Sequence, residues 1–389
     1  MFDHLQIYAP RERTVVGLAD VALTPLRWFR GSASAATPAR VLLLRLERIG
    51  DLLMTHEAIA SARQLWPAAE IDLAVGSWNA PLARLIPEVT RVDVLDVPWL
   101  AREGTGLSWP ALVSRARRWR TRRYDLVINF EPDIRSNFLA WHSGASRSVG
   151  YWTAGGGAFL TDALAYDPAA HVAANAQRLL MHVDARAGSL SGAAPRLAMD
   201  APSEAAAARA LSGVPAEHRL VGLHVSGGRE SKQWHLSRFA DVGRQIAQEP
   251  NVTLVLTGGP GDRALVDEVK AQLGTTPAVD TSGTLDLPAT AALLARLTML
   301  ITGDTGPMHL AASVGTPVIA LFGPSDPRRY GPLATHQQVL RVQLPCSPCG
   351  QVRLPPERCR GHVPDCMDGI TVAAVVDAAQ RWLREGVSR

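Results

Sequence analysis

The sequence has 389 residues, 47% of them hydrophobic, which is enough to bury large apolar cores and favours two globular domains. The formal net charge of +4 is too small to indicate nucleic-acid binding by the whole molecule. Every hydrophobic run is too short or too interrupted to span a bilayer, and the best candidate, residues 15–26, contains Asp20 and Pro25. We therefore predict no transmembrane helix.

Residues 1–39 match neither of the two series of strands and helices that follow, and we treat them as an N-terminal arm. The sequence does not decide whether this arm is mobile or interfacial, or whether it touches a membrane. From residue 40 onward, apolar runs of strand length alternate with longer helical patterns, which predicts parallel sheets built from strand–helix–strand units. The expected strands of the first half are residues 41–46, 70–75, 92–95 and 125–130. With a helix at residues 51–66, they form a first Rossmann-like domain at residues 40–187.

The segment Arg48-Ile49-Gly50-Asp51 directly follows the first predicted strand. A carboxylate near a helix N-terminus is stabilised in its ionised form and can accept a proton, so Asp51 is our candidate general base. The same position is an ordinary helix-capping site. Both interpretations stay open at this point.

Six arginines fall between residues 115 and 123, together with Trp119. This composition suits binding to phosphates or to an anionic membrane surface. A solvated helix face is the alternative interpretation.

A stretch rich in Gly, Ser, Ala and Pro at residues 188–202 divides the chain, and we place the interdomain linker there. Five strands are expected beyond it, at residues 220–225, 252–257, 299–302, 317–322 and 339–343. They define a second Rossmann-like domain at residues 203–370, with a Ser-capped helix at residues 237–247. A final helix in residues 371–389 is expected to return to the first domain. The fold class is therefore α/β, with two Rossmann-like domains facing a shared cleft.

Lys232 lies in a loop that follows the strand ending near His224. The chain has 38 arginines and only two lysines, so a lysine in this Gly-containing loop departs from the local composition. A compact ammonium group suits a diphosphate leaving group whose negative charge grows during bond cleavage. An exposed, solvated lysine is the alternative.

The segment Gly258-Gly259-Pro260-Gly261-Asp262 opens a helix after a predicted strand. Gly259-x-Gly261-x-x-Ala264 formally matches the dinucleotide fingerprint, which raises the alternative of an NAD-dependent oxidoreductase. The match falls in the second domain, and Pro260 crowds the amides that a pyrophosphate would need. Asp262 can instead hold ribose hydroxyls.

The turn at residues 303–309 reads Gly-Asp-Thr-Gly-Pro-Met-His and joins a short strand to a helix. Thr305 and Gly306 can donate amides to a phosphate oxygen at the helix N-terminus. Asp304 is expected to contact a sugar, and His309 lies on the first helical turn. A simple cap and a surface histidine are the alternatives for these two residues.

The four cysteines all lie between residues 346 and 366, unlike the even distribution of a disulfide-stabilised secreted protein. We therefore expect a cytoplasmic protein. In the loop 345–367, Cys346, Cys349, Cys359 and Cys366 either hold a structural Zn or Fe ion or are reduced thiols packed in the loop. The acidic residues singled out here include no local Asp-x-Asp pair, so we predict no catalytic metal.

Taken together in this order, five pieces of the chain resemble glycosyltransferase family 9, the ADP-heptose:lipopolysaccharide heptosyltransferase family. The pieces are Arg45-Leu46-x-x-Ile49-Gly50-Asp51, Ser231-Lys232-x-Trp234, Thr257-Gly258-Gly259-Pro260-Gly261, the turn at residues 303–309, and Phe322-Gly323-Pro324-x-Asp326-Pro327. The resemblance covers about residues 41–383.

The resemblance implies a GT-B fold in which the first domain binds the acceptor and the second binds the nucleotide sugar. It implies a metal-independent, inverting transfer without a cofactor, in which Asp51 deprotonates an acceptor hydroxyl and Lys232 stabilises the leaving diphosphate. The implied donor is ADP-heptose, and the implied acceptor is a lipopolysaccharide core or a related anionic glycolipid or glycan at the inner membrane. The expected donor-binding residues are Ser226, Gly227, Lys232, Asp262, Asp304, Thr305, Gly306 and His309, and the expected acceptor-binding residues are Arg48 and Arg118.

Two features depart from the family pattern. The family commonly has His-Pro-Gly where this chain has His224-Val225-Ser226-Gly227, and the arm before residue 41 is long for the family. A protein that binds nucleotide sugars or glycans without turnover therefore remains an alternative, beside the oxidoreductase.

Overall fold

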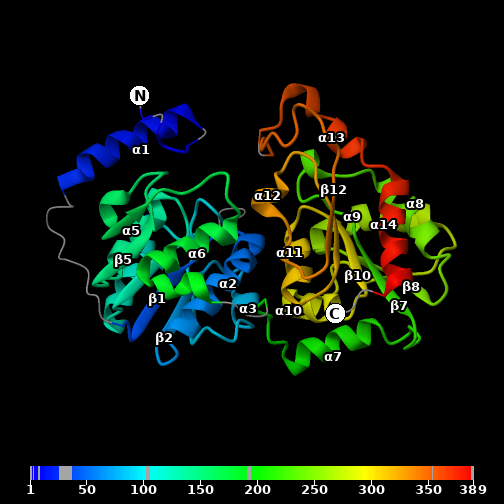
Figure 1. Ribbon diagram of the computed structural model, residues 1–389, viewed down its shortest axis with the longest axis horizontal. Helices are drawn as coiled ribbons and strands as arrows, with labels where there is room; N and C mark the ends of the chain where they lie inside the picture. The colour runs from blue at the N-terminus through cyan, green and yellow to red at the C-terminus, as the bar shows by residue number, and fades with distance from the viewer. Residues whose placement is uncertain are drawn as a thin grey trace. The chain divides into compact units, whose positions relative to one another are not determined.

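The structure is a computed structural model that describes residues 2, 4–7, 9–25, 37–101, 106–190, 194–352 and 354–386 (Figure 1). The chain divides into two compact units, Met1–Pro195 and Arg196–Arg389. This division falls inside the expected linker at residues 188–202, of which residues 191–193 lie outside the described part. Each unit is an α/β layer structure with its own parallel sheet.

Unit 1 contains a six-stranded parallel sheet with the strand order β3-β2-β1-β4-β5-β6. The strands are β1 (Arg40–Leu44), β2 (Glu70–Val75), β3 (Arg91–Val94), β4 (Leu126–Asn129), β5 (Arg147–Tyr151) and β6 (Asp162–Leu164). The first four were expected from their apolar runs. The last two were missed because β5 contains a serine and a glycine and β6 has only three half-buried residues.

Helices connect these strands, as the parallel pairing requires. They are α2 (Ile49–Leu65), α3 (Ala80–Ala83), α4 (Trp109–Arg118), α5 (Ile134–His142) and α6 (Val172–Val183), with short 3₁₀ turns η2 (Trp119–Arg122), η3 (Gly157–Phe159) and η4 (Ala185–Ser189). The α2 helix buries most of its residues between the sheet and α6, which fits its sequence of apolar and small side chains. It begins at Ile49, two residues before the expected start.

Part of the N-terminal arm is a helix, α1 (Pro10–Leu23), that packs on unit 1. Asp20 Oδ1 accepts a hydrogen bond from Gly156 N at 2.7 Å, and Gln6 N donates to Thr153 O at 2.7 Å. Val16 is buried and lies against Gly155. The described part of the arm is therefore docked on the loop that carries η3, whereas residues 26–36 of the arm lie outside the described part.

Unit 2 repeats the same sheet pattern, with the order β12-β11-β10-β7-β8-β9. The strands are β7 (Arg219–His224), β8 (Val252–Thr257), β9 (Ala278–Asp280), β10 (Met299–Gly303), β11 (Val318–Leu321) and β12 (Gln337–Leu340). All five expected strands are present, and β12 begins two residues earlier than expected. The short, half-buried edge strand β9 gave no pattern long enough to predict it.

The helices of unit 2 are α7 (Ala201–Ala210), α8 (Leu236–Ile246), α9 (Arg263–Leu273), α10 (Leu287–Leu294), α11 (Gly306–Ser313), α12 (Pro327–Tyr330), α13 (Asp365–Asp368) and α14 (Val372–Glu385). Short 3₁₀ turns lie at η5 (Glu230–Lys232), η6 (Pro260–Asp262) and η7 (Glu357–Cys359). The N-cap of α8 is His235, so the predicted serine cap at Ser237 is wrong.

The last helix, α14, does not show the expected return to the first domain. Val375, Val376 and Leu383 are buried in the hydrophobic core of unit 2, and α14 packs against α8. Its apolar stripe joins the same core as the buried side chains of α8 and α9.

Both sheets change direction at one place. In unit 1 the chain moves outward from β1 through β2 to β3 and then returns to β4 beside β1, and in unit 2 the same reversal places β10 beside β7. In open α/β sheets, ligands bind beyond the carboxyl ends of the strands at such a reversal. The segments that follow β1 and β4, and those that follow β7 and β10, are therefore the places to examine.

Candidate active site

Asp51 lies beyond the carboxyl end of β1, in the first turn of α2. Its Oδ2 accepts a hydrogen bond from Arg48 N at 3.1 Å, and Arg45 Nη2 lies 3.4 Å from its Oδ1. The side chain is 25% exposed, so it is held in place and still open to solvent on one side. The carboxylate thus caps the helix and remains accessible to a substrate, and the two interpretations of this residue are compatible.

Arg45 is a buried arginine at the centre of this loop, with a side chain only 4% exposed. Its guanidinium contacts Glu47 Oε2 at 2.9 Å, Phe130 O at 3.1 Å and Asp51 through both the carboxylate and the backbone carbonyl. Burial disfavours the charged form, but the carboxylates of Glu47, Asp51 and Glu131 raise the pKa of Arg45. Arg45 therefore stays charged and fixes the position of Asp51.

Glu131 was not predicted, and it is the most buried acidic side chain at this edge, with 1% exposure. Its Oε1 accepts hydrogen bonds from Leu46 N and from Glu47 N, the latter at 2.9 Å. Burial, the Glu47 carboxylate and Asp133 raise the pKa of Glu131 well above its usual range, against the opposing effect of Arg45. Glu131 joins the end of β4 to the loop after β1, so it holds the loop that presents Asp51.

The two arginines predicted to bind an acceptor lie in different places. Arg48 is exposed beside Asp51, with its guanidinium 5.8 Å from the centre of the Trp78 ring. Arg118 ends α4, just before a turn in which Arg122 pairs with Glu70 at the start of β2. That turn lies at the amino edge of the sheet, because β2 begins there. The structure therefore brings Arg48, and not Arg118, to the edge that holds Asp51.

In unit 2, Lys232 meets the turn that follows β10. Its Nζ donates to the backbone carbonyl of Asp304 and lies 3.3 Å from Asp304 Oδ2. The two side chains are 18% and 13% exposed. Lys232 is thus a partly buried, paired ammonium group at the β7/β10 reversal, and the interpretation as a solvated surface lysine is wrong.

The loop between β7 and η5 is closely packed around Gly227. A Cβ atom at this position would lie 2.6 Å from Gln233 N and 2.7 Å from the Lys232 carbonyl carbon, so only glycine fits. The Gly227 amide donates to Gln233 Oε1 at 2.8 Å, and Ser226 Oγ accepts from Gly228 N at 3.2 Å. These predicted donor-binding groups have partners within the loop and help to shape it, and their binding of the donor stays a prediction.

The turn after β10 has the geometry expected of an anion site. Thr305 is the N-cap of α11, and Gly306 is its first residue, where a helix leaves amides without intrahelical acceptors. Thr305 is 8% exposed, and its Oγ1 lies 3.2 Å from Thr302 Oγ1. His309 is 6% exposed, so it is buried and not the surface histidine of the alternative interpretation.

Asp262 lies one strand away, beyond β8. Its Oδ2 accepts a hydrogen bond from Gly259 N at 2.8 Å, which occupies the first amide of the dinucleotide-like segment. A Cβ at Gly261 would meet nothing within 4 Å, so this glycine is not needed for a close approach. Nearby His224 is buried, and its burial lowers the pKa of the imidazole despite the charge of Asp262. This segment lacks the features of a pyrophosphate-binding turn.

The four cysteines are free thiols in environments that differ. Cys366 is buried in the core of unit 2, whereas Cys346 is exposed. Burial, with the nearby thiols of Cys349 and Cys359, raises the pKa of Cys366 to about 11. Across the residues that the structure describes, which include all four cysteines, no group of three or more His, Cys, Asp or Glu side chains is placed to hold a metal ion. The structure thus does not support the predicted Zn or Fe site.

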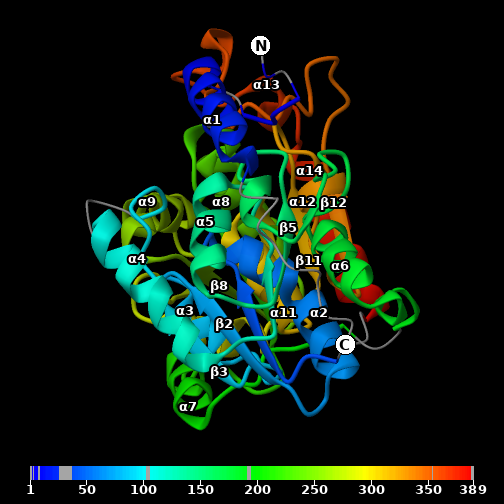
Figure 2. The same ribbon diagram turned by 90° about the vertical axis from the view of Figure 1, so that its left-hand side faces the viewer.

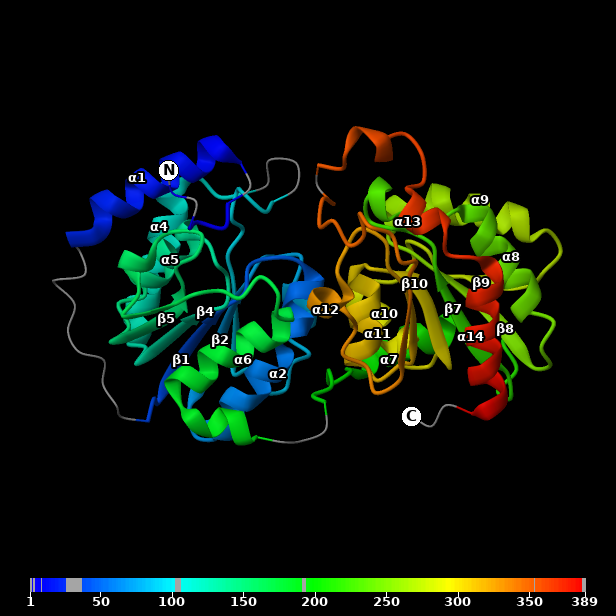
Figure 3. The same cartoon turned by 45° about the horizontal axis from the view of Figure 1, so that its top comes forward.

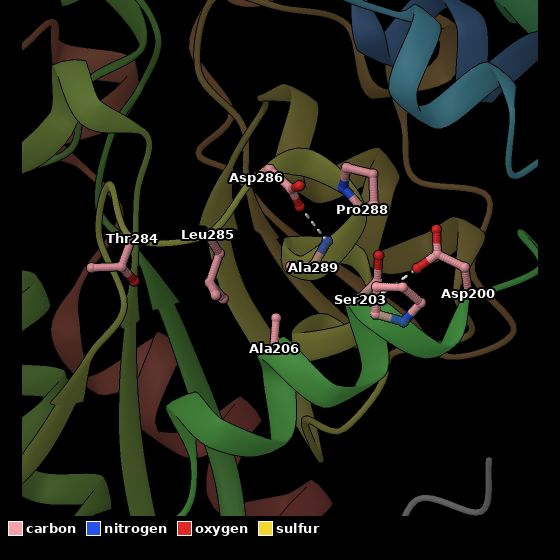
Figure 4. A pocket seen from close by; sticks show the side chains of 9 residues that line it. Asp200, Ser203, Ala206, Thr284, Leu285, Asp286, Pro288 and Ala289 are labelled. Atoms are coloured by element: carbon pink, nitrogen blue, oxygen red, sulfur yellow. Dashed lines mark hydrogen bonds between the residues drawn. The ribbon is translucent and has the colours of Figure 1, made fainter.

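A cavity of about 410 Å³ in unit 2 lies between α7 and the start of α10 (Figure 4). It is lined by Asp200, Pro202, Ser203, Ala206, Thr284, Leu285, Asp286, Pro288 and Ala289. Asp200 and Asp286 cap their helices through Ser203 N and Ala289 N, each at 2.8 Å. None of the predicted site residues lines this cavity, so we do not assign the donor to it.

The described part of the chain contains no helix that is both long and apolar enough to cross a membrane.

Comparison with known proteins gives the same assignment as the motifs. The model of glycosyltransferase family 9 (heptosyltransferase) matches residues 113–356, more than half of the chain. Lipopolysaccharide core heptosyltransferase OpsX of Haemophilus influenzae is 22% identical over 311 residues, covering 78% of this chain and 85% of the relative.

Two solved structures share the fold. A family 9 glycosyl transferase from Veillonella parvula has a TM-score of 0.79 and 24% identity, covering 90% of this chain and 98% of that one. The E. coli ADP-heptose lps heptosyltransferase II has a TM-score of 0.73 and 20% identity, covering 90% of this chain and all of the other. Both units are therefore the Rossmann-like halves of a GT-B fold, and the chain belongs to glycosyltransferase family 9, the heptosyltransferase family, and is a glycosyltransferase.

Proposed function

We propose that this enzyme transfers a heptose from ADP-heptose to a sugar of a lipopolysaccharide core or a related anionic glycolipid. Relatives of similar length bear the names of lipopolysaccharide heptosyltransferases, and one solved relative is named for ADP-heptose. The observation that carries the proposal is the pairing of Lys232 with Asp304 at the β7/β10 reversal, beside the open amides of the α11 N-terminus. That arrangement suits a diphosphate joined to a sugar.

In this mechanism Asp51 accepts the proton of an acceptor hydroxyl as its oxygen attacks the anomeric carbon. The bond from the anomeric carbon to the diphosphate breaks on the opposite side, so the configuration inverts. Arg45 and Glu131 hold the loop that carries Asp51 in position. The guanidinium of Arg48 contacts the anionic acceptor.

The leaving nucleoside diphosphate carries the growing negative charge, which Lys232 and the Thr305 and Gly306 amides neutralise. Asp304 orients the Lys232 ammonium and contacts the sugar. His309 and Asp262 lie at the boundary of the donor site. The ammonium and amides take the role that a divalent cation plays in metal-dependent transferases, so we propose a metal-independent reaction. Four free thiols support action in a reducing compartment, and we propose that this is the cytoplasmic side of the inner membrane.

The decisive experiment offers ADP-, GDP- and UDP-sugars with a core oligosaccharide acceptor and measures release of nucleoside diphosphate. ADP-heptose should give the fastest release, and a chelator should leave the rate unchanged. Absence of acceptor-dependent release with every donor would overturn the proposal.

A test of the catalytic base uses Asp51→Asn. This change should lower kcat by about 10²–10⁴-fold, because general-base catalysis typically contributes that factor, while donor affinity is retained. Asp200→Asn is the matched control, since Asp200 also caps a helix but lies in unit 2 away from the β7/β10 reversal. Equal effects of the two substitutions would assign Asp51 a capping role only.

A further inference from the structure

Exposed apolar side chains of unit 1 concentrate on three helices. Among the described residues, eight large hydrophobic side chains are exposed, and five of them lie on α1, α4 and α5. They are Val15, Leu18 and Val21 of α1, Trp109 of α4 and Trp141 of α5. Figures 2 and 3 show these three helices next to one another on one side of unit 1. We call this surface the α1/α4/α5 face.

The α1 helix has two apolar sides. Val16 faces inward and is buried against the η3 loop, whereas Val15, Leu18 and Val21 are between 57% and 67% exposed. The packing of α1 on unit 1 accounts for the hydrophobic residues on its inner side. It does not account for those on its outer side. They indicate that the outer side has a partner of its own.

Aromatic contacts link α1 and α4 through α5. Phe138 of α5 lies 6.4 Å from the ring of Trp109 and 5.3 Å from that of Phe159 in η3, and Trp141 lies 5.9 Å from Phe159. The η3 loop in turn supports α1. The exposed residues are thus parts of one connected surface.

The α4 side of this surface is rich in arginine. Residues 106–124 contain six arginines and no acidic residue, and residues 134–161 also contain no acidic residue. Of the six, Arg122 is already paired with Glu70 and Asp72. Arg117 and Arg118 are exposed and form no ion pair with any described residue. Burial and the positive charges of Arg117 and Arg120 lower the pKa of His142, which is consistent with a positive field here. On α1, Glu12 is exposed and Asp20 is engaged with Gly156.

Arg117 also lines a shallow, mostly apolar hollow of about 440 Å³ on the outer side of α4, with Trp109, Pro110, Val113 and Ser114. Trp109, Val113 and Arg117 follow at intervals of four residues and share one side of the helix. An indole and an aliphatic side chain beside a guanidinium are the combination that lies at the headgroup level of a bilayer.

We propose that the α1/α4/α5 face binds the surface of an anionic lipid bilayer. The apolar side chains of α1 and the two tryptophans insert at the headgroup boundary, and the arginines of α4 contact lipid phosphates. An acidic protein partner would match the arginines. It would not explain the exposed hydrophobic side chains on the outer side of α1.

Docking in this way places the membrane beside the proposed acceptor site. Trp109 stacks on Trp99 at 5.4 Å, and the Arg135 guanidinium lies 4.8 Å from the Trp99 ring. Arg135 pairs with Asp133, just beyond β4 at the edge that holds Asp51. This last step rests on the proposed function, whereas the docking face itself does not.

The test is flotation of the full chain with vesicles of phosphatidylglycerol in phosphatidylcholine, compared with vesicles of phosphatidylcholine alone. The protein should float with the anionic vesicles, and high salt should reduce its binding. The double substitution Arg117→Glu and Arg118→Glu should lower the partition coefficient at least about tenfold. The double substitution Val15→Ser and Leu18→Ser should lower it several-fold.

Matched controls lie in unit 2. Arg209→Glu with Arg358→Glu makes the same charge change at exposed arginines, and Leu354→Ser removes a side chain that is 75% exposed. These variants should bind vesicles like the unaltered chain, and thermal unfolding followed by circular dichroism verifies that every variant is folded. No flotation of the unaltered chain, or an equal loss in the unit 2 controls, would overturn the proposal.

Release of nucleoside diphosphate with a water-soluble acceptor, measured on the unaltered chain and on the same variants, separates the two proposals. Turnover without vesicle binding by the unaltered chain contradicts the docking face alone. Vesicle binding without turnover by the unaltered chain contradicts the proposed function alone.

Discussion

Asp51 and Glu131 are two carboxyl groups at the same sheet edge with different surroundings. Asp51 has a 25% exposed side chain, whereas Glu131 is 1% exposed and accepts two backbone hydrogen bonds. Carboxyl groups in such unequal environments commonly divide the work between them. Here the exposed one is suited to exchange a proton with a substrate, and the buried one is suited to hold the loop.

The raised pKa of Glu131 predicts a pH dependence of stability. Burial and the neighbouring carboxylates keep the folded side chain protonated over a pH range in which the unfolded chain has lost that proton. The resulting stabilisation is complete below the ordinary pKa of a glutamate and is lost as pH rises through the raised pKa. Relative to the unaltered chain, Glu131→Gln should therefore gain free energy of unfolding as pH rises, by up to about 1.4 kcal/mol per pH unit.

Urea unfolding at a series of pH values checks this prediction. Glu57→Gln is the control, because Glu57 is exposed on α2 and its substitution should show no such trend. A pH-independent difference for Glu131→Gln would contradict the prediction.

Lys232 and Lys270 are the only two lysines of the chain, and they form a natural comparison. Lys232 pairs with Asp304, whereas Lys270 is 54% exposed and pairs with Asp280 on the surface of unit 2. Lys232→Met should lower kcat by about 10²–10³-fold, the usual loss when one group that stabilises developing charge is removed. Lys270→Met should leave turnover unchanged, and similar losses in both variants would count against a role for Lys232.

The sequence predicted roles for Asp51 and Lys232 because each follows a predicted strand. Asp51 lies near a helix N-terminus, and Lys232 is one of only two lysines of the chain. It did not identify Glu131, although an acidic residue directly after the strand at residues 125–130 was a usable signal. The role of Glu131 depends on β1 and β4 being neighbours in the sheet. Glu131 contacts Leu46, and the two residues are 85 positions apart in the sequence. Such an adjacency is a property of the sheet order and is not visible in either segment alone.

At the scale of the elements, the loop between β7 and η5 departs from the family pattern, yet its close backbone packing leaves room only for glycine at Gly227. Gly227→Ala would push a methyl group into the backbone of Gln233 and should destabilise unit 2 by about 1–3 kcal/mol, with weaker donor binding. Gly261→Ala is the control, since its methyl group would meet nothing within 4 Å. Chemical unfolding and donor titration measure both effects, and a harmless Gly227→Ala would show that the loop can relax.

Strand boundaries were predictable where most residues of the strand are buried, as in β2, β8 and β10, whereas β1 ends two residues earlier than expected. The short edge strands β6 and β9 were not, because three half-buried residues contain no full period of alternation. The α1 helix was missed for a different reason. Its inward side contacts the η3 loop through Val16 and Asp20, and this docking is a tertiary contact that its own composition does not signal.

At the scale of the whole molecule, two parallel sheets were predictable from the alternation of strands and helices, whereas their common strand order was not predicted. The assignment of the last helix was not, because an amphipathic helix fits any apolar surface of suitable width. Its place in the core of unit 2 yields a prediction that distinguishes the two possibilities.

A chain shortened after Ile370 lacks α14 and therefore exposes the apolar core that Val375, Val376 and Leu383 help to fill. Limited proteolysis should then cleave unit 2 rapidly while unit 1 stays resistant. A chain shortened after Gly386 is the control and should remain resistant throughout. Selective loss of unit 1 would instead support a return of the last helix to the first domain.

The stack of Arg135, Trp99 and Trp109 also gives the protein an optical reporter. Indole emission responds to polarity and to a nearby cation, and this stack runs from the edge beside Asp133 to a side chain that is 45% exposed. The chain contains ten tryptophans, so the difference spectrum between the unaltered protein and Trp109→Phe isolates the contribution of Trp109. Arrival of an acceptor or of a lipid surface at unit 1 thereby becomes visible in real time without an attached label.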